Sequence, residues 1–266
     1  MIIYNTLKNT YPKIIHANGI WDNSVKEILN KINLEYKQGD GLECFHYNNV
    51  EINNQTELFL FNSNNINLDE EIGIYTWNNK ISRDKWLFEL VCDINKLKYT
   101  NLITQKKFTT FDKLYTINKE IKRLKLINSP IKYLFCCDSK DVFFIDHPNN
   151  FIKEFLKDKN YKMIINAETN DYPNNTTIIE SQNQGPFKYL NSGAYIAQID
   201  FLEEFTNYCL SLTENNKSKF LNDPHCFDQF LFKKSYENFK NDCLLDCNSD
   251  LFLCLYNCNP NWLNFM

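Results

Sequence analysis

Two aspartates, Asp138 and Asp141, stand three positions apart directly after an apolar run that ends at Cys137. Carboxylates at the end of a buried strand are costly unless a cation compensates their charge. A hard divalent ion prefers carboxylate oxygens and can be shared with a diphosphate. The spacing is compatible with a metal site, and a strand-end turn in which one aspartate caps a helix is the structural alternative.

Three other constellations contain residue types that could bind or react with a ligand. Asn191, Ser192 and Gly193 predict a sharp turn at which the glycine lets the backbone approach a ligand, with a plain hairpin turn as the alternative. Asp228 and Gln229 open an apolar segment, where an acidic first turn of a helix is the structural alternative.

The third of these, His16-Ala17-Asn18-Gly19, follows a short β-branched run. A histidine in this position can bind a metal ion or can be a buried structural residue.

The elements that must position these residues alternate between strand and helix. Periodicity predicts the following order: strand 72–77, helix 82–97, strand 100–104, helix 110–126, strand 133–137, helix 151–156, strands 163–167 and 195–199, and helix 201–212, with 228–232 and 251–256 closing the core. This alternation predicts an α/β fold with a mostly parallel sheet flanked by helices, in which ligands bind beyond the carboxyl ends of the strands. Before residue 71 we expect a strand at 13–16, a helix at 24–34, and a connecting segment at 38–69 with a strand or two.

Composition excludes several classes of protein. The chain has 266 residues and is 43% hydrophobic, which is enough for a large buried core and excludes a mainly disordered chain. A net charge of −4 disfavours a general nucleic-acid binder. No apolar run is long enough to span a bilayer and the N-terminus does not look like a signal peptide, so we expect a cytoplasmic protein without a membrane partner.

Cysteine and asparagine usage adds two expectations. The ten cysteines fit reduced, mostly buried thiols better than a disulfide scaffold, and the spacing of Cys243, Cys247, Cys254 and Cys258 is a weak match to a zinc site. Abundant Asn, Ile, Lys, Phe and Tyr are typical of an A/T-rich genome, such as that of a protist or a large DNA virus, and a viral protein would act in the host cytoplasm.

Together, the D-x-x-D, L-N-S-G and D-Q segments, in this order, resemble the glycosyltransferase domain of procollagen lysyl hydroxylases and related collagen glycosyltransferases. Residues 111–121 resemble the lysine-bearing helix of that family, 167–173 its A-E-S-x-x-W-P segment with Tyr172 in place of Trp, and 245–252 its late L-D segment. The resemblance covers roughly 71–258 and implies a GT-A-like, Rossmann-type fold.

One piece of the family pattern stands elsewhere in this chain. The family's domain ends in P-x-x-x-H-G-N-G, whose histidine binds the metal, and the matching piece here is residues 11–19, at the N-terminus. We expect a circular permutant, in which 1–32 packs on a glycosyltransferase core at 71–266 and 33–70 connects them. An exchanged homodimer, in which 1–32 completes the site of a partner, is the alternative.

The resemblance also implies roles for individual residues. Asp138, Asp141 and His16 would hold Mn²⁺. The UDP-sugar donor, UDP-glucose or alternatively UDP-galactose, would be bound by Thr76, Lys113, Asp138, Lys140, Asn18, Gly19, Ser192 and Gly193. Asn191, Asp228 and Gln229 would act at the sugar, with Glu168, Asp246 and Tyr172 as further candidates near the sugar or acceptor.

The closest resemblance is to the domain that transfers glucose to galactosyl-hydroxylysine in collagen, which implies a hexosyltransferase with a collagen-like acceptor. The chain departs from the family at Lys140, which takes an aromatic position, at Ala17, which replaces a glycine, and at Asp22, where a lysine is expected. Two alternatives therefore stay open: a UDP-sugar transferase with a glycan or other non-collagen acceptor, and a non-catalytic binding module with a transferase fold.

Overall fold

The structure is a computed structural model that describes residues 3–18, 27, 34–39, 42–47, 67–78, 87–102, 109–173, 185–213 and 227–265. Within these residues no helix is long and apolar enough to cross a membrane. The eight cysteines whose side chains the structure describes are buried and form no disulfide bonds with one another.

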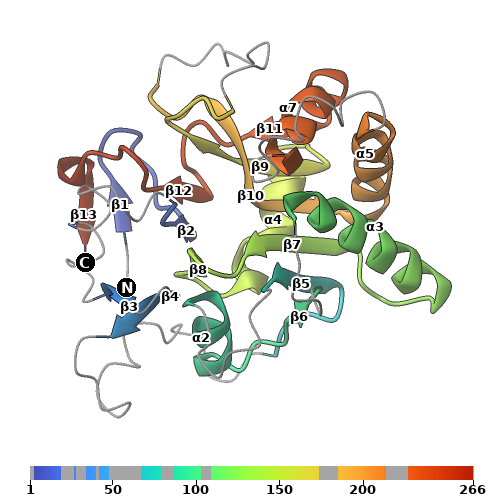
Figure 1. Ribbon diagram of the computed structural model, residues 1–266, viewed down its shortest axis with the longest axis horizontal. Coiled ribbons are helices and arrows are strands. Elements are labelled where there is room, and N and C mark those ends of the chain that lie inside the picture. Colours follow the sequence, from blue (N-terminus) through green and yellow to red (C-terminus); the bar gives the residue numbers. More distant parts are fainter. Residues whose placement is uncertain are drawn as a thin grey trace.

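A six-stranded sheet forms the centre of the fold (Figure 1), with the strand order β11-β9-β10-β7-β5-β6. The strands are β5 (Ile72–Trp77), β6 (Thr100–Asn101), β7 (Tyr133–Asp138), β9 (Met163–Glu168), β10 (Tyr189–Gln198) and β11 (Cys243–Leu245). Only β10 runs antiparallel to its neighbours in this sheet, so the other strands share one direction. The prediction of an α/β fold with a mostly parallel sheet is confirmed.

The central strands are mostly apolar and buried, which explains why they form the core. All six residues of β5 and all six of β9 are buried, as expected for strands covered on both faces. Phe135 on β7 packs against Phe144, with ring centroids 4.6 Å apart, and against Phe88 of α2 (Leu87–Ile94). This aromatic cluster anchors the strand that ends at Asp138.

Three helices pack against one another along the sheet: α3 (Thr110–Leu126), α5 (Ile199–Ser211) and α7 (Phe227–Phe239). Helix α3 begins with a capping box between Thr109 and Asp112 and buries an apolar face that includes Leu114, Ile117 and Ile121. Asn118 joins α3 to α5 by donating to Thr206 and Asn207. Helix α4 (Ile152–Asp158) follows a short 3-10 helix at Pro148–Asn150 and contacts β7 and β10.

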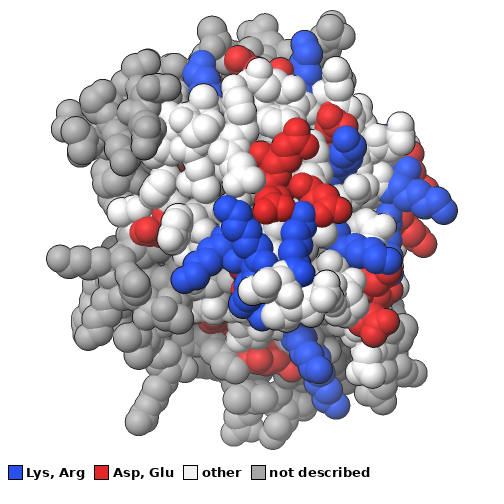
Figure 2. All heavy atoms as spheres, turned by 90° about the vertical axis from the view of Figure 1, so that its right-hand side faces the viewer, with Lys and Arg blue, Asp and Glu red and all other residues white. Residues whose placement is uncertain are grey.

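The outer face of the helical layer has mixed charge. Figure 2 shows acidic and basic side chains next to one another on this side of the molecule. Lys125 of α3, for example, lies 2.6 Å from a carboxylate oxygen of both Asp200 and Glu203.

The first and last segments of the chain lie side by side (Figure 1). Strand β1 (Ile3–Asn5) pairs with β13 (Leu263–Phe265), which follows a short 3-10 helix at Pro260–Trp262. Strand β2 (Ile14–His16) lies between β12 (Phe252–Cys254) and β8 (Val142–Phe144) in a three-stranded sheet. Strands β3 (Leu34–Gly39) and β4 (Leu42–Tyr47) form a separate hairpin.

Most predicted elements match the structure closely. Helix α3 spans the predicted 110–126, whereas α4, α5 and β9 differ from their predicted ends by one or two residues. Of the predicted helix 82–97, the structure describes residues from 87 onward, and β6 covers the first two residues of the predicted strand 100–104. The predicted helix at 24–34 lies almost wholly outside the described residues.

Candidate active site at the carboxyl edge of the sheet

The polar residues singled out by their spacing gather at one edge of the central sheet. Asp138 ends β7 and Glu168 ends β9, two parallel strands on either side of β10, so both residues lie at the carboxyl edge of the sheet. Because β10 runs the other way, its first residues, including Asn191, reach the same edge. Ligands bind at this edge in open α/β sheets.

Strand pairing places His16 beside the D-x-x-D segment. His16 is opposite Val142 in the β2–β8 pair, and the amide of the next residue, Ala17, donates to the carbonyl of Asp141 over 2.8 Å. As a result, His16 Nε2 lies 3.5 Å from Asp141 Oδ1. The imidazole is almost fully buried, whereas the Asp141 side chain is partly exposed.

The charges around His16 and Asp141 act on each other's protonation. Burial lowers the pKa of His16, but the carboxylates of Asp141, Asp138 and Glu168 outweigh it, so the net pKa is raised. For Asp141, burial raises the pKa, and the attraction of His16 and Lys140 brings it below its ordinary value. Lys140, which stands between Asp138 and Asp141 in the sequence, is half-buried. Its positive charge therefore helps to keep the Asp141 carboxylate ionised.

Lys113 of α3 connects the D-x-x-D segment to α7. Its Nζ lies 2.6 Å from Asp138 Oδ1 and 3.3 Å from Asp228 Oδ2. These two carboxylates raise the pKa of Lys113 against the opposing effect of its burial. Burial raises the pKa of Asp138, and Lys113 only partly offsets that effect. The positive charge of Lys113, held between two carboxylates, could also bind a phosphate group of a ligand.

The L-N-S-G segment and the start of α7 form one hydrogen-bonded unit. Ser192 Oγ donates to Asp228 Oδ2 over 3.0 Å, and its backbone amide donates to Gln229 Oε1 over 3.2 Å. Gln229 Nε2 donates in turn to Glu168 Oε1 over 2.8 Å and to the carbonyl of Tyr172. This unit joins β9, β10 and α7 at the edge of the sheet.

The prediction of a sharp turn at Asn191–Gly193 is wrong. These residues lie inside β10, where the pairing with β9 shifts register between Leu190 and Tyr195. Asn191 Oδ1 accepts the amide of Gly193 over 2.7 Å, so the side chain bonds locally within an irregular strand. The residues form a bulge that holds the strand's polar groups at the edge of the sheet.

Glu168 is held on both oxygens and is 4% exposed. Gln229 donates to one oxygen, and Asn18 Nδ2 donates to the other over 3.0 Å. Burial raises the pKa of Glu168, an effect that the hydrogen bonds from Gln229 and Asn191 and the charge of His16 oppose. Asn18 also accepts from Cys254 Sγ over 2.8 Å, so its position depends on both chain ends.

Two predicted residues are engaged in structural bonds. Thr76 is fully buried and its hydroxyl donates to the carbonyl of Cys137 over 2.9 Å, so only an oxygen lone pair is left for a ligand. Both oxygens of Asp246 accept backbone amides, from residues 250, 251 and 252, and hold the turn before β12. Gly19 lies outside the described residues.

Asn166 is a residue of this site that the sequence patterns did not single out. It is fully buried on β9, and its Nδ2 lies 2.9 Å from His16 Nδ1. The available signal was a polar residue inside the apolar run 163–167, because buried polar side chains in strands need a partner.

Two residues that contact His16 each have a buried oxygen without a hydrogen-bond partner: Asp141 Oδ1 and Asn166 Oδ1. Oxygen atoms without a hydrogen-bond donor can bind a cation. One imidazole nitrogen together with carboxylate oxygens is a common set of ligands for divalent metal ions. Yet in the described part of the chain no three His, Cys, Asp or Glu side chains are already arranged to hold a metal, and Lys113 contacts Asp138. His16 and Asp141 fit the ion as they stand, whereas Asp138 would have to release Lys113.

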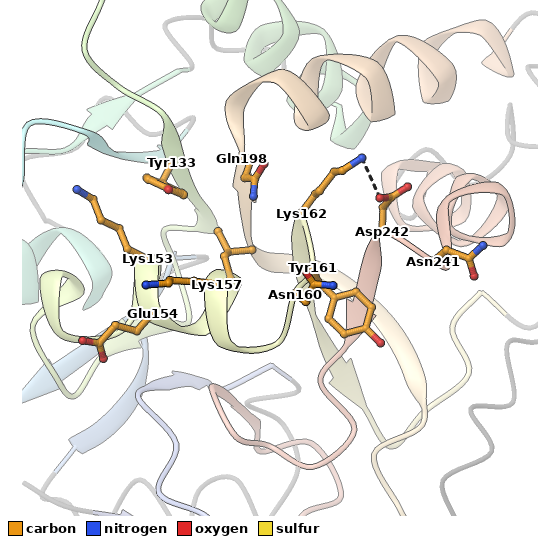
Figure 3. Close-up of a pocket in the computed structure, with 11 residues that line it drawn as sticks. Tyr133, Lys153, Glu154, Lys157, Asn160, Tyr161, Lys162, Gln198, Asn241 and Asp242 are labelled. Carbon is orange, nitrogen blue, oxygen red and sulfur yellow. Dashed lines mark ion pairs between the residues drawn. The ribbon is translucent and has the colours of Figure 1, made fainter.

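A separate pocket of about 780 Å³ lies at the opposite edge of the sheet (Figure 3). It is lined by Tyr133 at the start of β7, Gln198 at the end of β10 and residues around the start of β9. Lysines line it, but Lys153 contacts Asp69 and Glu71, and Lys162 pairs with Asp242 over 2.9 Å. None of the residues predicted to bind the donor or metal lines this pocket.

Comparison with known proteins gives little beyond the geometry. Neither a family model nor a curated protein matches this chain. One solved structure, "crystal structure of a glycosyltransferase involved in the glycosylation of the major capsid of PBCV-1", is 14% identical, covers 71% of this chain and 95% of its own, and superposes with a TM-score of 0.41. A TM-score at this level is too low to assign function, which has to be argued from the residues of the site.

Proposed function

We propose that this chain is a Mn²⁺-dependent glycosyltransferase that transfers glucose from UDP-glucose to galactosyl-hydroxylysine in a collagen-like protein. The observation that carries the proposal is the position of His16 Nε2, 3.5 Å from Asp141 Oδ1, a buried carboxylate oxygen that has no hydrogen-bond partner. The resemblance of the sequence motifs to collagen glycosyltransferases assigns these same two residues to the metal. The pairing of β1 with β13 supports a circular permutation, because it places the N- and C-terminal segments side by side. When the termini lie close together, a segment can be moved from one end of the sequence to the other without altering the core.

His16, Asp138 and Asp141 would hold the metal. A Mn²⁺ ion held by these residues would supply Lewis-acid stabilisation of the negative charge on the departing diphosphate. Lys113 moves its ammonium from Asp138 to a donor phosphate, which frees that carboxylate as a ligand. Lys140, Asn18 and Gly19 would add polar contacts to the phosphates or ribose, and Thr76 would contact the nucleotide.

The other side of the site binds the sugars. Asn191, Ser192 and Gly193 face the donor glucose, and Asp228 and Gln229 orient it through the hydrogen bonds that join α7 to β10. The acceptor hydroxyl oxygen attacks the anomeric carbon as the bond from that carbon to the phosphate breaks. Attack comes from the face that the diphosphate leaves, so the configuration is retained. The leaving phosphate takes the hydroxyl proton, so the transfer needs no protein base.

Release of UDP tests the proposal directly. We would incubate the protein with UDP-glucose or UDP-galactose, with Mn²⁺ or EDTA, and with or without a galactosyl-hydroxylysine peptide. The expected result is Mn²⁺-dependent release from UDP-glucose that the peptide increases. If the peptide does not change the rate of UDP release, the collagen assignment is contradicted. The protein would then be a UDP-sugar transferase with another acceptor, such as a glycan.

A second function, a non-catalytic binding module, is favoured by one observation. Lys113 already neutralises Asp138, 2.6 Å away, in the position where a metal would do so. If this ion pair is permanent, the fold can bind a partner or nucleotide without metal chemistry. Absence of UDP release from either donor would support this function and contradict the first.

A further inference from the structure

Asn166 is a polar side chain buried in the middle of the apolar strand β9. It is 0% exposed, and among the described residues its side chain contacts the imidazole of His16, with 2.9 Å between Asn166 Nδ2 and His16 Nδ1. The other end of the amide, Oδ1, has no hydrogen-bond partner. Burying an amide with one end unpaired lowers the stability of the fold, which is the cost of placing a polar group beside His16.

With Nδ2 toward Nδ1, the amide would donate to the ring and the proton of a neutral imidazole would be on Nε2. Because the two ends of an amide have the same shape, the side chain fits this space equally with its carbonyl oxygen toward His16. With the carbonyl end toward His16, the amide accepts a hydrogen bond from Nδ1–H. A neutral imidazole carries only one N–H, so Nε2 then presents a lone pair. That lone pair points to the side on which Asp141 lies.

The contact between His16 and Asp141 favours this tautomer. The 3.5 Å between Nε2 and Asp141 Oδ1 is longer than an ordinary N–H···O bond, and Asp141 Oδ1 has no hydrogen-bond partner. Two donor atoms bound to one cation at about 2.1 Å each can be at most about 4.2 Å apart. The separation therefore suits two ligands of the same ion better than a direct hydrogen bond.

Gly193 restricts the imidazole from a second side. A Cβ added at Gly193 would lie 2.5 Å from His16 Cε1 and 3.0 Å from Nε2. The ring is thus held between the backbone of β10 and the amide of Asn166, so a change of tautomer cannot be accommodated by simple rotation of the ring.

We propose that Asn166 is a positioning residue: its carbonyl oxygen accepts Nδ1–H of His16 and keeps Nε2 free to bind a divalent cation together with Asp141. The inference rests on the proposed function, which makes His16 and Asp141 metal ligands. Hydrogen-bond partners of this kind orient a ligating histidine and set its tautomer.

The first test is the tautomer of His16, measured by ¹⁵N NMR on the metal-free protein at alkaline pH, where the ring is neutral. The expected result is a proton on Nδ1 in the wild type and in Asn166→Asp, which keeps an acceptor. In Asn166→Ala the proton is expected to move to Nε2 in a large fraction of molecules. A proton on Nε2 in the wild type would overturn the proposal.

The second test is the binding of Mn²⁺ alone, followed by calorimetry. Asn166→Ala is expected to weaken Mn²⁺ binding about 10- to 100-fold, and Asn166→Asp to stay close to wild type. The matched control is Asn118→Ala, which removes a buried asparagine that joins α3 to α5 away from the site. This control should lower stability without changing the His16 tautomer or Mn²⁺ affinity.

The tests separate this inference from the proposed function. If the wild type binds Mn²⁺ with the expected tautomer but releases no UDP, the transferase assignment fails and the role of Asn166 stands. If UDP release is Mn²⁺-dependent but Asn166→Ala changes neither tautomer nor affinity, the role of Asn166 is overturned and the transferase assignment stands.

Discussion

Gly193 and His16 pack so closely that position 193 has no room for a side chain. A Cβ there would come within 2.5 Å of His16 Cε1 and 2.9 Å of Asn191 Oδ1. The glycine is needed for space, and through it β10 and the N-terminal segment form one site.

Gly193→Ala should therefore displace His16. We expect Mn²⁺ affinity and Mn²⁺-dependent UDP release to fall at least about tenfold, with a loss of about 1–3 kcal/mol in unfolding free energy from overpacking. Calorimetry with Mn²⁺ and urea unfolding measure the two effects. Gly73→Ala is the matched control, because its Cβ would crowd Tyr75 and Leu134 rather than the site. Equal Mn²⁺ affinity in both variants would contradict the role of Gly193.

Asp141→Ala should abolish Mn²⁺-dependent turnover and leave the fold intact. Asp141 is partly exposed and has a buried oxygen without a hydrogen-bond partner, so its removal breaks few stabilising contacts. UDP release and circular dichroism check the two expectations. Asp146→Ala is a suitable control, because Asp146 pairs with Lys13 over 3.0 Å outside the cluster. Near-normal activity of Asp141→Ala would refute the metal assignment.

Lys113→Met should destabilise the protein, because it leaves Asp138 and Asp228 without their shared cation. Removing one partner of a buried ion pair typically costs about 3–5 kcal/mol, and the partial exposure of Asp138 places the expected loss near the lower end, about 3 kcal/mol. If a metal binds Asp138, Mn²⁺ should restore part of this loss.

Urea unfolding with and without Mn²⁺ measures both effects. Lys125→Met is the control, because Lys125 pairs with Asp200 and Glu203 at the surface and should lose no more than about 1 kcal/mol. Similar losses in both variants would show that Lys113 is not a buried compensating charge.

Asp246 should make stability depend on pH. Burial raises the pKa of its carboxyl to about 6, against the opposing hydrogen bonds from the amides of residues 250–252. Because the folded protein holds this proton more tightly than the unfolded chain, the contribution is fully present below about pH 4 and is lost as the pH rises through about 6. The loss is up to about 3 kcal/mol, at about 1.4 kcal/mol per pKa unit.

Asp246→Asn removes this titration and also places an amide N–H₂ against backbone donors. We expect the variant to be less stable than wild type at low pH by about 1–3 kcal/mol. The difference should shrink between about pH 4 and pH 6 as the wild type loses the contribution of its proton. Urea unfolding across this range measures the difference, and parallel stability curves would contradict the assignment.

The sequence predicted the elements that depend on local pattern. Helix α3 matched its predicted ends because a capping box marks its start and its apolar residues repeat with helical spacing. Asp138 and Asp141 were expected after a buried strand, and β7 does end at Asp138. The turn expected at Asn191–Gly193 failed because hydrogen bonds to α7 and the close approach of His16 keep these residues in the sheet.

Sequence alone determined an α/β chain with polar residues after its strands, because hydrophobic period and strand-end composition are local properties. Only the tertiary structure decided which of these residues meet. His16 reaches Asp141 because β2 inserts between β12 and β8, and Lys113 reaches Asp228 because α3 packs on α7. Such contacts depend on which distant segments of the chain pack against each other. The sequence around Asn166 therefore could not predict that its partner is His16, 150 residues away.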